Sequence, residues 1–341
     1  MNIKHESRRK TPWDSVSEEQ LTPTQEFLKS KYQQHYEQHH PQITDTEEYK
    51  LINSFVPADC PFCHSEKFFR QGHTRNNVQR YRCSECRATF LPTTGTIFDG
   101  HKISISEWME FCLNLFHYVS INADSWNNKN AFQTSKYWLL KIFAILEDYQ
   151  NSIVLSGSVW LDETYYKVSK QDVDVKDDGK EYRGLSHNQI CIGGAYDKDN
   201  VLCLYEGQGK TSQKKTWETF GSHIQKGSIL VHDDEQGHKK LVNNLSLTSK
   251  VHPAKELKGI ADESNPLNPV NRIHMLLQEF LHSHNSFSRD EINGYLNLFS
   301  FIINPPHDYL EKVEELVNLA FQKRKLLRYR EQFGLNKRDG N

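Results

Sequence analysis

Two apolar runs in the second half of the chain each end in an aspartate. The run VWL at 159–161 precedes Asp162, and the run SILVH at 228–232 precedes Asp233. A carboxylate at the end of an apolar strand costs free energy unless it caps a backbone turn or binds a cation. One such aspartate is more often a turn residue, because aspartate is common at turns. Two of them predict strand ends whose side chains meet at one edge of a sheet and bind a metal ion there.

The residues beside these two aspartates are polar as well. Glu163 and Asp234 follow them, and His232 precedes the second. Because neighbouring residues of a strand point to opposite faces of the sheet, we expect only a supporting role for these three side chains.

Four of the seven cysteines form two close pairs, CPFC at 60–63 and CSEC at 83–86. Two such pairs are typical of one zinc ion bound by four thiolates in a closed tetrahedral site, whereas a redox pair needs only one CxxC. Short strands at 67–70 and 78–82 would complete a zinc ribbon, whose alternating arginine and aromatic residues suit contact with a DNA backbone. A purely structural ribbon is the alternative. The predicted zinc ligands are Cys60, Cys63, Cys83 and Cys86.

Length and composition describe an ordinary globular protein. The chain has 341 residues, of which 36% are hydrophobic and 25% charged, and both fractions are typical of globular domains. It holds no apolar run of about 18 residues, and its first ten residues lack the apolar segment of a signal peptide. We therefore expect a cytoplasmic protein without a membrane partner. Disulfides are rare in that compartment, so Cys112, Cys191 and Cys203 are expected to be buried free thiols.

Basic residues concentrate in two segments of the chain. Residues 60–90 hold six lysines and arginines against two glutamates, and residues 322–341 hold seven against two acids. Basic flanks around a more acidic middle suit a protein that holds a polyanion. The net charge of −2 alone indicates no such partner, and a charged run is often only a solvated surface.

The first half of the chain carries polar and helical segments around the cysteine pairs. Residues 1–55 are polar, with a weak helical pattern over 22–36. Helical periodicity over 93–150 predicts one helix capped by Ser106 and another over 135–146. The polar stretch 122–130 between them could be the turn of a helix-turn-helix, and ordinary helix packing is the alternative.

Strands and helices alternate from Gly157 onward. Strands are expected at 157–168, 189–196, 201–205, 228–232 and 250–252, and helices at 217–224, 236–245, 269–282 and 290–303. The order of three strands, helix, strand, helix, strand and helix is that of an RNase H-like α/β fold, a mixed sheet covered by helices. The expected domains are a polar appendage (1–55), a zinc ribbon (56–92), a helical DNA-binding region (93–150), an RNase H-like catalytic domain (151–305) and a basic helical tail (306–341).

A third metal ligand is expected on the helix at 269–282. In this element order the ligands fall on the first strand, just after the fourth strand, and on the helix after the fifth. One face of the helix brings Asn271, His274 and Gln278 toward the sheet, at helical spacings of three, four and seven residues. The amide oxygen of Asn271 is a hard, neutral ligand that Mg²⁺ accepts beside carboxylates.

Taken together, the motifs of this chain resemble a known family. The motifs are the double CxxC, RYRCSECRATF followed by TGTIF, WLDETYY, RGLSHNQICIGGA, GSILVHDDEQGH and NPVNRIHMLLQEFL. They are similar to those of DDE-type insertion-sequence transposases of the zinc-ribbon group often called ISXO-two-like, in the subgroup whose third acid is replaced by asparagine. The resemblance covers the chain from about Cys60 to Asn304.

This resemblance implies a function and a set of site residues. Asp162, Asp233 and Asn271 would bind two Mg²⁺ or Mn²⁺ ions for in-line phosphoryl transfer, in which element ends are cut and joined to target DNA. Members usually carry lysine seven residues after the third ligand, where this sequence has Gln278, and NRIH could place His274 where other members carry glutamate. The implied partners are double-stranded DNA, as terminal inverted repeats and as target, and further copies of the chain paired on the DNA ends.

Two other functions remain open at the level of the sequence. A domesticated, catalytically silent zinc-ribbon protein would bind DNA without cutting it, and Gln278 in place of lysine favours this alternative. An RNase H-like nuclease would keep the metal site and cut DNA without strand transfer. End-specific joining of DNA separates a transposase from both.

Overall fold

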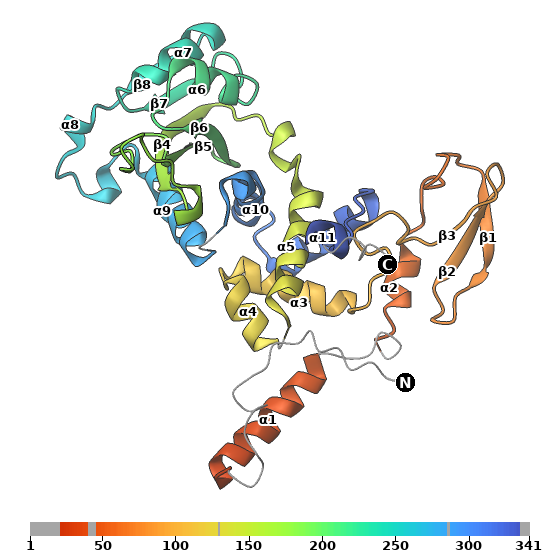
Figure 1. Cartoon of the computed structure of the whole chain (residues 1–341). Helices are drawn as coiled ribbons and strands as arrows, with labels where there is room; N and C mark the ends of the chain where they lie inside the picture. Colours follow the sequence, from red (N-terminus) through yellow and green to blue (C-terminus); the bar gives the residue numbers. More distant parts are fainter. Residues whose placement is uncertain (1–20, 40–45, 129, 285–286, 335–341) are drawn as a thin grey trace. The chain divides into compact units, whose positions relative to one another are not determined.

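The computed structural model describes residues 21–39, 46–128, 130–284 and 287–334. The chain divides into two compact units, one formed by the chain up to Ile145 together with the segment from Asp308, the other by Leu146–His307 (Figure 1). Within the described ranges, no helix is both long and apolar enough to cross a membrane.

The first unit combines a small sheet with helices. Its elements are α1 (Pro23–His39), α2 (Tyr49–Ser54), β1 (Phe68–His73), β2 (Gln79–Cys83), β3 (Thr89–Phe90), α3 (Ile105–Phe116), α4 (Ile121–Asn127), α5 (Phe132–Leu146), α11 (Tyr309–Gln322) and α12 (Tyr329–Gln332). The three strands pair antiparallel in the order β1-β2-β3, which confirms the two strands predicted between the cysteine pairs. Phe68, Tyr81 and Phe90 pack against one another beside the buried Cys60 and Cys83.

The polar stretch 122–130 is mostly helical, so the prediction that it is a turn between two helices is wrong for residues 122–127. Ser120 caps α4, since its side chain accepts a hydrogen bond from the backbone of Ala123. The buried carboxylate of Asp124 accepts hydrogen bonds from Asn114 of α3 (2.8 Å) and Ser135 of α5 (3.0 Å). The polar residues of this stretch therefore hold three helices together.

The segment from Asp308 packs within the first unit. Asp308 caps α11, and Phe321 near the end of this helix stacks on Phe55 with ring centroids 4.0 Å apart. Arg324 then donates to the backbone carbonyl of Asp59 (2.8 Å) and pairs with its carboxylate. These contacts hold the end of α11 and Arg324 against residues 55–59, just before Cys60.

The second unit is built on one five-stranded sheet. Its strands are β4 (Ser158–Lys167), β5 (Gln189–Tyr196), β6 (Val201–Gln208), β7 (Ile229–His232) and β8 (Thr248–Val251), and they lie in the order β6-β5-β4-β7-β8. Strands β4, β5 and β6 pair antiparallel, whereas β7 pairs parallel with both β4 and β8. The mixed sheet and its element order are those predicted, and so is the β5–β6 hairpin, in which Asp197 accepts hydrogen bonds from the turn (2.8 Å).

Helices cover both faces of this sheet (Figure 1). They are α6 (Gln213–Phe220), α7 (Lys239–Leu245), α9 (Asn268–Ser283) and α10 (Ile292–Ile303), whereas the short α8 (Ala254–Leu257) lies out on the connection between β8 and α9. Two adjacent glycines of β5 define the faces: a Cβ at Gly193 would overlap Phe220 of α6, and one at Gly194 would overlap His274 of α9. Because neighbouring strand residues point to opposite faces, α6 and α9 lie on opposite sides of the sheet.

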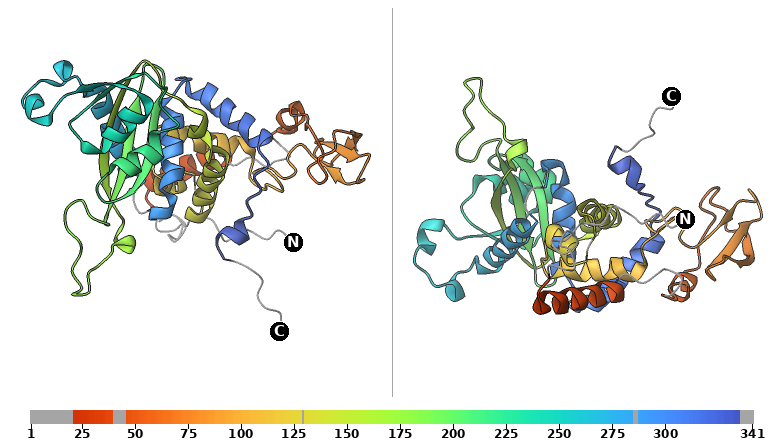
Figure 2. Two further views of the ribbon diagram at one scale, coloured as in Figure 1. Left: turned by 90° about the horizontal axis from the view of Figure 1, so that it is seen from above. Right: turned by 60° about the horizontal axis from the view of Figure 1, so that its bottom comes forward.

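Most helix starts differ by a few residues from those expected. Ser104, not Ser106, caps α3 by accepting a hydrogen bond from Glu107. Helix α6 starts at Gln213, before the expected range 217–224, because Ser212 caps it. Helix α9 starts at Asn268, one residue before the expected range 269–282. Between β4 and β5, residues 168–188 extend away from the sheet as a long connection (Figure 2).

Candidate active site

The parallel pairing of β4 and β7 places Asp162 and Asp233 at the same edge of the sheet. Trp160 lies opposite Val231 in the register of these strands. Asp162 and Asp233 each follow two residues later, the first within β4 and the second just beyond β7. The two aspartates are therefore aligned as expected, but Asp162 lies in the middle of β4 and not at its end.

The carboxylates of Asp162 and Asp233 are half-buried, in a negatively charged setting. Burial, together with the negative charges of Asp233 and Glu163, raises the pKa of Asp162 to about 7. Burial also raises the pKa of Asp233. Like charges that are held together in this way are stabilised by a divalent cation, for which carboxylate oxygens are suitable ligands.

Helix α9 contributes His274 to this edge of the sheet. Its Nδ1 lies 3.8 Å from Oδ2 of Asp162, and its ring is buried against Gly194, the residue of β5 that pairs with Asp162. Burial lowers the pKa of His274 to about 4, so its imidazole is neutral at pH 7. His274 is thus a neutral nitrogen donor beside Asp162, and neutral imidazole is a common metal ligand. Among the described residues, the ligand atoms of Asp162, Asp233 and His274 do not all lie within 4.8 Å of one another.

Asn271 lies one turn earlier on α9, where its side chain is exposed. Asp233 and His274 are thus each brought near Asp162, whereas Asn271 makes no side-chain hydrogen bond to any part of the chain that the structure describes. The structure therefore separates Asn271 from His274, although the sequence pattern places both on one face of the helix.

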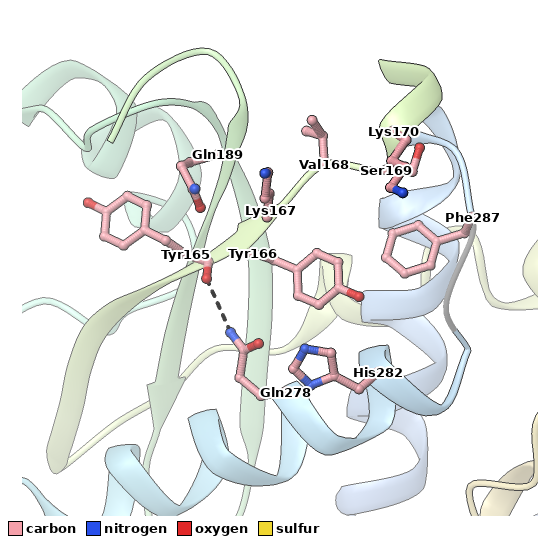
Figure 3. Close-up of a pocket in the computed structure, with 10 residues that line it drawn as sticks. All are labelled: Tyr165, Tyr166, Lys167, Val168, Ser169, Lys170, Gln189, Gln278, His282 and Phe287. Atoms are coloured by element: carbon pink, nitrogen blue, oxygen red, sulfur yellow. Dashed lines mark hydrogen bonds between the residues drawn. The ribbon is translucent and has the colours of Figure 1, made fainter. Parts of the chain in front are cut away.

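Gln278 lies one turn beyond His274 and binds the sheet. Its amide nitrogen donates to Oγ1 of Thr164 (3.0 Å) and, at 3.4 Å, to the carbonyl of Tyr165. Gln278 also lines a cavity of about 760 Å³ further along β4, shown in Figure 3. Its other lining residues are mainly aromatic and polar, among them Tyr166, Lys167, Lys170, Gln189, His282 and Phe287.

A buried row of polar side chains lies beside the two aspartates. Nε2 of His238 is 3.0 Å from a carboxylate oxygen of Glu163, and Nδ1 of His238 is 3.0 Å from Nδ1 of His232. Nε2 of His232 is 2.8 Å from the hydroxyl of Ser249 on β8. One ring nitrogen of each histidine and a carboxylate oxygen of Asp233 all lie within 4.8 Å of one another.

Sequence reasoning gave Glu163 and His232 only a supporting role and missed His238. His238 ends the motif HDDEQGH and sits in the turn between β7 and α7. Two histidines flanking an acidic turn are a metal-binding pattern, but only the fold brings both rings to Asp233 and Glu163.

The four paired cysteines form a second candidate metal centre, in the first unit. The Sγ atoms of Cys60 and Cys86 are 3.7 Å apart, those of Cys63 and Cys83 are 3.5 Å apart, and all four lie within 4.8 Å of one another. Zinc–sulfur bonds of about 2.3 Å give a tetrahedron with edges of about 3.8 Å, so the separations fit zinc. The other cysteines, Cys112, Cys191 and Cys203, are buried and free, as predicted.

Similar turns build both halves of this cluster. The residue after the second cysteine of each pair, His64 or Arg87, has a left-handed backbone, with φ of 58° and 60°. The backbone amides then bond back across the turn, as in His64 N to Cys60 O (2.9 Å) and Cys83 N to Ala88 O (3.0 Å). Local chain geometry therefore sets the positions of the thiols.

Comparison with known proteins gives one relative in sequence. No family model matches the chain. An uncharacterized protein in transposable element ISH50 of Halobacterium salinarum is 27% identical over 185 residues, which cover 52% of this chain and 58% of that protein. The chain therefore matches less than two thirds of the relative's length. It is similar to a protein of a transposable element.

Among solved structures, the chain is matched to a pre-cleavage Mos1 transpososome. The match has 12% identity and a TM-score of 0.24, and it covers 63% of this chain and 78% of that one. A likeness at this level carries no argument about the fold.

Proposed function

We propose that the chain is an insertion-sequence transposase that cuts the ends of its element and joins them to target DNA. The observation that carries this proposal is the alignment of Asp162 and Asp233 on adjacent parallel strands, with His274 3.8 Å from Asp162. Its support is twofold: the strand order β6-β5-β4-β7-β8 fits an RNase H-like catalytic unit, and the sequence relative belongs to a transposable element.

In this proposal Asp162 and Asp233 hold the catalytic divalent ions, and α9 supplies the third ligand. The burial of His274 against Asp162 supports His274 in that role, whereas the exposure of Asn271 argues for a lesser one. When bound, Mg²⁺ or Mn²⁺ would activate water or a DNA 3′-hydroxyl and stabilise the leaving oxygen in an in-line displacement. The carboxylates position the ions, and α9 closes one side of the site.

The first unit would bind the DNA. Its four cysteines fit a structural zinc, and the sheet β1-β2-β3 then forms a zinc ribbon. Arg70, Arg75 and Arg80 are exposed on or between the first two strands, and Phe69 is 53% exposed beside them. Exposed arginines contact phosphates, and an exposed ring can pack on sugars or bases.

The alternatives make different use of the same residues. A silent DNA-binding protein is favoured by Gln278, because this amide binds Thr164 where family members carry a lysine. A nuclease without strand transfer would use the same aspartates. Both alternatives keep the ribbon, so DNA binding alone separates none of the three.

The test uses full-length protein, DNA from both flanks of its own gene, and either Mg²⁺ or Mn²⁺. A transposase produces cut ends and joined products, and Asp162→Asn or Asp233→Asn removes both. Glu279→Gln, an equal charge change at an exposed position of α9, is the matched control and should retain both. Cutting without joining identifies a nuclease, and binding without cutting identifies a silent protein.

A further inference from the structure

We propose that His232, Asp233 and His238 form a binding site for a transition-metal ion, such as Mn²⁺, Co²⁺ or Zn²⁺, which shares Asp233 with the catalytic aspartate pair. The proposal deepens the proposed function, because it gives one ion of that active site two imidazole ligands. Two histidines and one carboxylate favour transition ions, whereas Mg²⁺ prefers ligands made of oxygen alone.

The rings of His232 and His238 face each other through their Nδ1 atoms. Nδ1 of His232 and Nδ1 of His238 are 3.0 Å apart, and both rings are buried. Two nitrogens bound to one ion at right angles, with bonds of about 2.1 Å, also lie about 3.0 Å apart. With the Asp233 carboxylate within 4.8 Å of both, one ion can reach three donors.

The outer nitrogens have the partners that metal-bound histidines need. Nε2 of His238 is 3.0 Å from the carboxylate of Glu163, and Nε2 of His232 is 2.8 Å from the hydroxyl of Ser249. A metal-bound histidine donates its other N–H to such an oxygen, which fixes the ring and its tautomer. If both outer nitrogens donate, the two Nδ1 atoms carry lone pairs 3.0 Å apart, and a cation bound to both, off the line that joins them, relieves their repulsion.

A hydrogen-bonded row without metal would also satisfy these atoms. In that row Ser249 donates to His232, His232 donates to His238, and His238 donates to Glu163. In the row, Asp233 accepts a hydrogen bond from the backbone of Glu235 (2.9 Å) and none from either histidine. Its carboxylate and those of Asp162 and Glu163 are close enough to repel one another. A divalent ion bound to Asp233 and both histidines would add two positive charges there, whereas the row adds at most one, by protonation of His238.

The test is a titration of zinc-loaded, full-length protein with Co²⁺, read by visible absorption in the presence of excess Mg²⁺. We expect one Co²⁺ per chain beyond the zinc. Its affinity should fall by at least about 10-fold in His238→Gln and His232→Asn, and stay within about 3-fold in Asp162→Ala. His284→Asn replaces another buried histidine of the same unit and should leave the affinity unchanged. Binding that ignores both histidines, or no binding beyond the zinc, overturns the site.

Two further measurements distinguish failure of this metal site from failure of the proposed function. Pulsed EPR of Mn²⁺ bound to the His274→Ala variant should show nitrogen coupling from the two remaining imidazoles, and its absence contradicts the site even if the buried variants do not fold. DNA cutting is measured in parallel. Co²⁺ bound through His238 in a protein whose cutting survives Asp162→Ala would leave this site standing and reject the proposed function. If cutting needs Asp162 but no metal is bound through imidazole nitrogen, the proposed function stands and this metal site is rejected.

Discussion

The cysteine cluster and the aspartate edge are both candidate metal centres, and the chain builds them in opposite ways. Each half of the cysteine cluster comes from four consecutive residues and one tight turn. At the aspartate edge, Asp162 and Asp233 come from strands that are neighbours only in the folded sheet, and His274 reaches Asp162 from a helix on one face. The first centre is set by local geometry, and the second by the register of two parallel strands.

Removing an aspartate should have the largest effect, because it acts on chemistry alone. Asp162→Ala or Asp233→Ala should reduce cutting of element ends by at least about 1,000-fold, since each carboxylate is expected to hold the ions. Binding of the same DNA, measured by gel shift, should stay nearly intact. Cutting that persists in either variant would place the active site elsewhere.

Removing cysteines should give the opposite pattern. Cys83→Ser with Cys86→Ser should lower the zinc content from about one per chain to none, because a structural zinc site needs all four thiolates. Elemental analysis measures the zinc, and DNA binding should weaken because the ribbon loses its fold. Cys112→Ser, at a buried thiol outside the cluster, is the control. An unchanged zinc content in the double variant would contradict the assignment.

The two candidate third ligands should separate clearly. His274→Ala should lower metal-dependent cutting by about 100-fold, because it removes the side chain nearest to Asp162. Asn271→Ala should change the rate by about 3-fold or less, because this side chain is exposed. Rates at saturating Mn²⁺ measure the difference. The reverse order of the two variants would restore Asn271, which the family resemblance favours.

The aspartate edge should also destabilise the metal-free fold as the pH rises. The pKa of Asp162 is about 7 in the folded protein, above its usual 3.8, so the folded state binds this proton more tightly than the unfolded state. The stability from this group is complete below about pH 4 and is lost as the pH rises through about 7. Asp162→Asn should therefore be more stable than the parent at pH 8, by about 2 kcal/mol in urea unfolding.

The control for this stability effect is Glu279→Gln, which should show no such gain because Glu279 is exposed. Added Mg²⁺ should reduce the difference in unfolding free energy between Asp162→Asn and the parent protein, because it stabilises the parent. If the parent protein is as stable as Asp162→Asn at pH 8 without divalent ions, repulsion among the carboxylates does not destabilise the fold.

The smallest effect is expected at Gln278. Gln278→Lys places a positive charge beside the cavity along β4 and should raise strand transfer by about 2- to 5-fold, because an ammonium attracts a phosphate that an amide only hydrogen-bonds. The gain is limited, since the change also removes the bond to Thr164. Gln278→Met, which lacks both charge and amide, is the control, and an equal gain there would exclude a phosphate contact.

Prediction from sequence succeeded where the pattern is local. Strands β1 and β2, the five strands of the second sheet, the β5–β6 hairpin and the paired cysteines all follow from short-range alternation and spacing, whereas the two-residue strand β3 was not predicted. It failed at 122–127, because Asp124 and Ser125 are buried between helices and not exposed in a turn, and only tertiary contacts such as Asp124 to Ser135 reveal this. His238 was missed for the same reason, since its partner Glu163 lies on another strand.

The adjacent glycines of β5 give this unit two independent points of sensitivity. A methyl group at Gly194 would push on His274, whereas one at Gly193 would push on Phe220, which packs in the apolar core on the other face. A larger residue at Gly194 would therefore disturb the candidate active site, and one at Gly193 would disturb the packing of the core. During evolution, a lineage that loses the need to cut DNA could accept a larger residue at Gly194 while Gly193 stays constrained, so this dipeptide would record the loss of activity before the fold shows it.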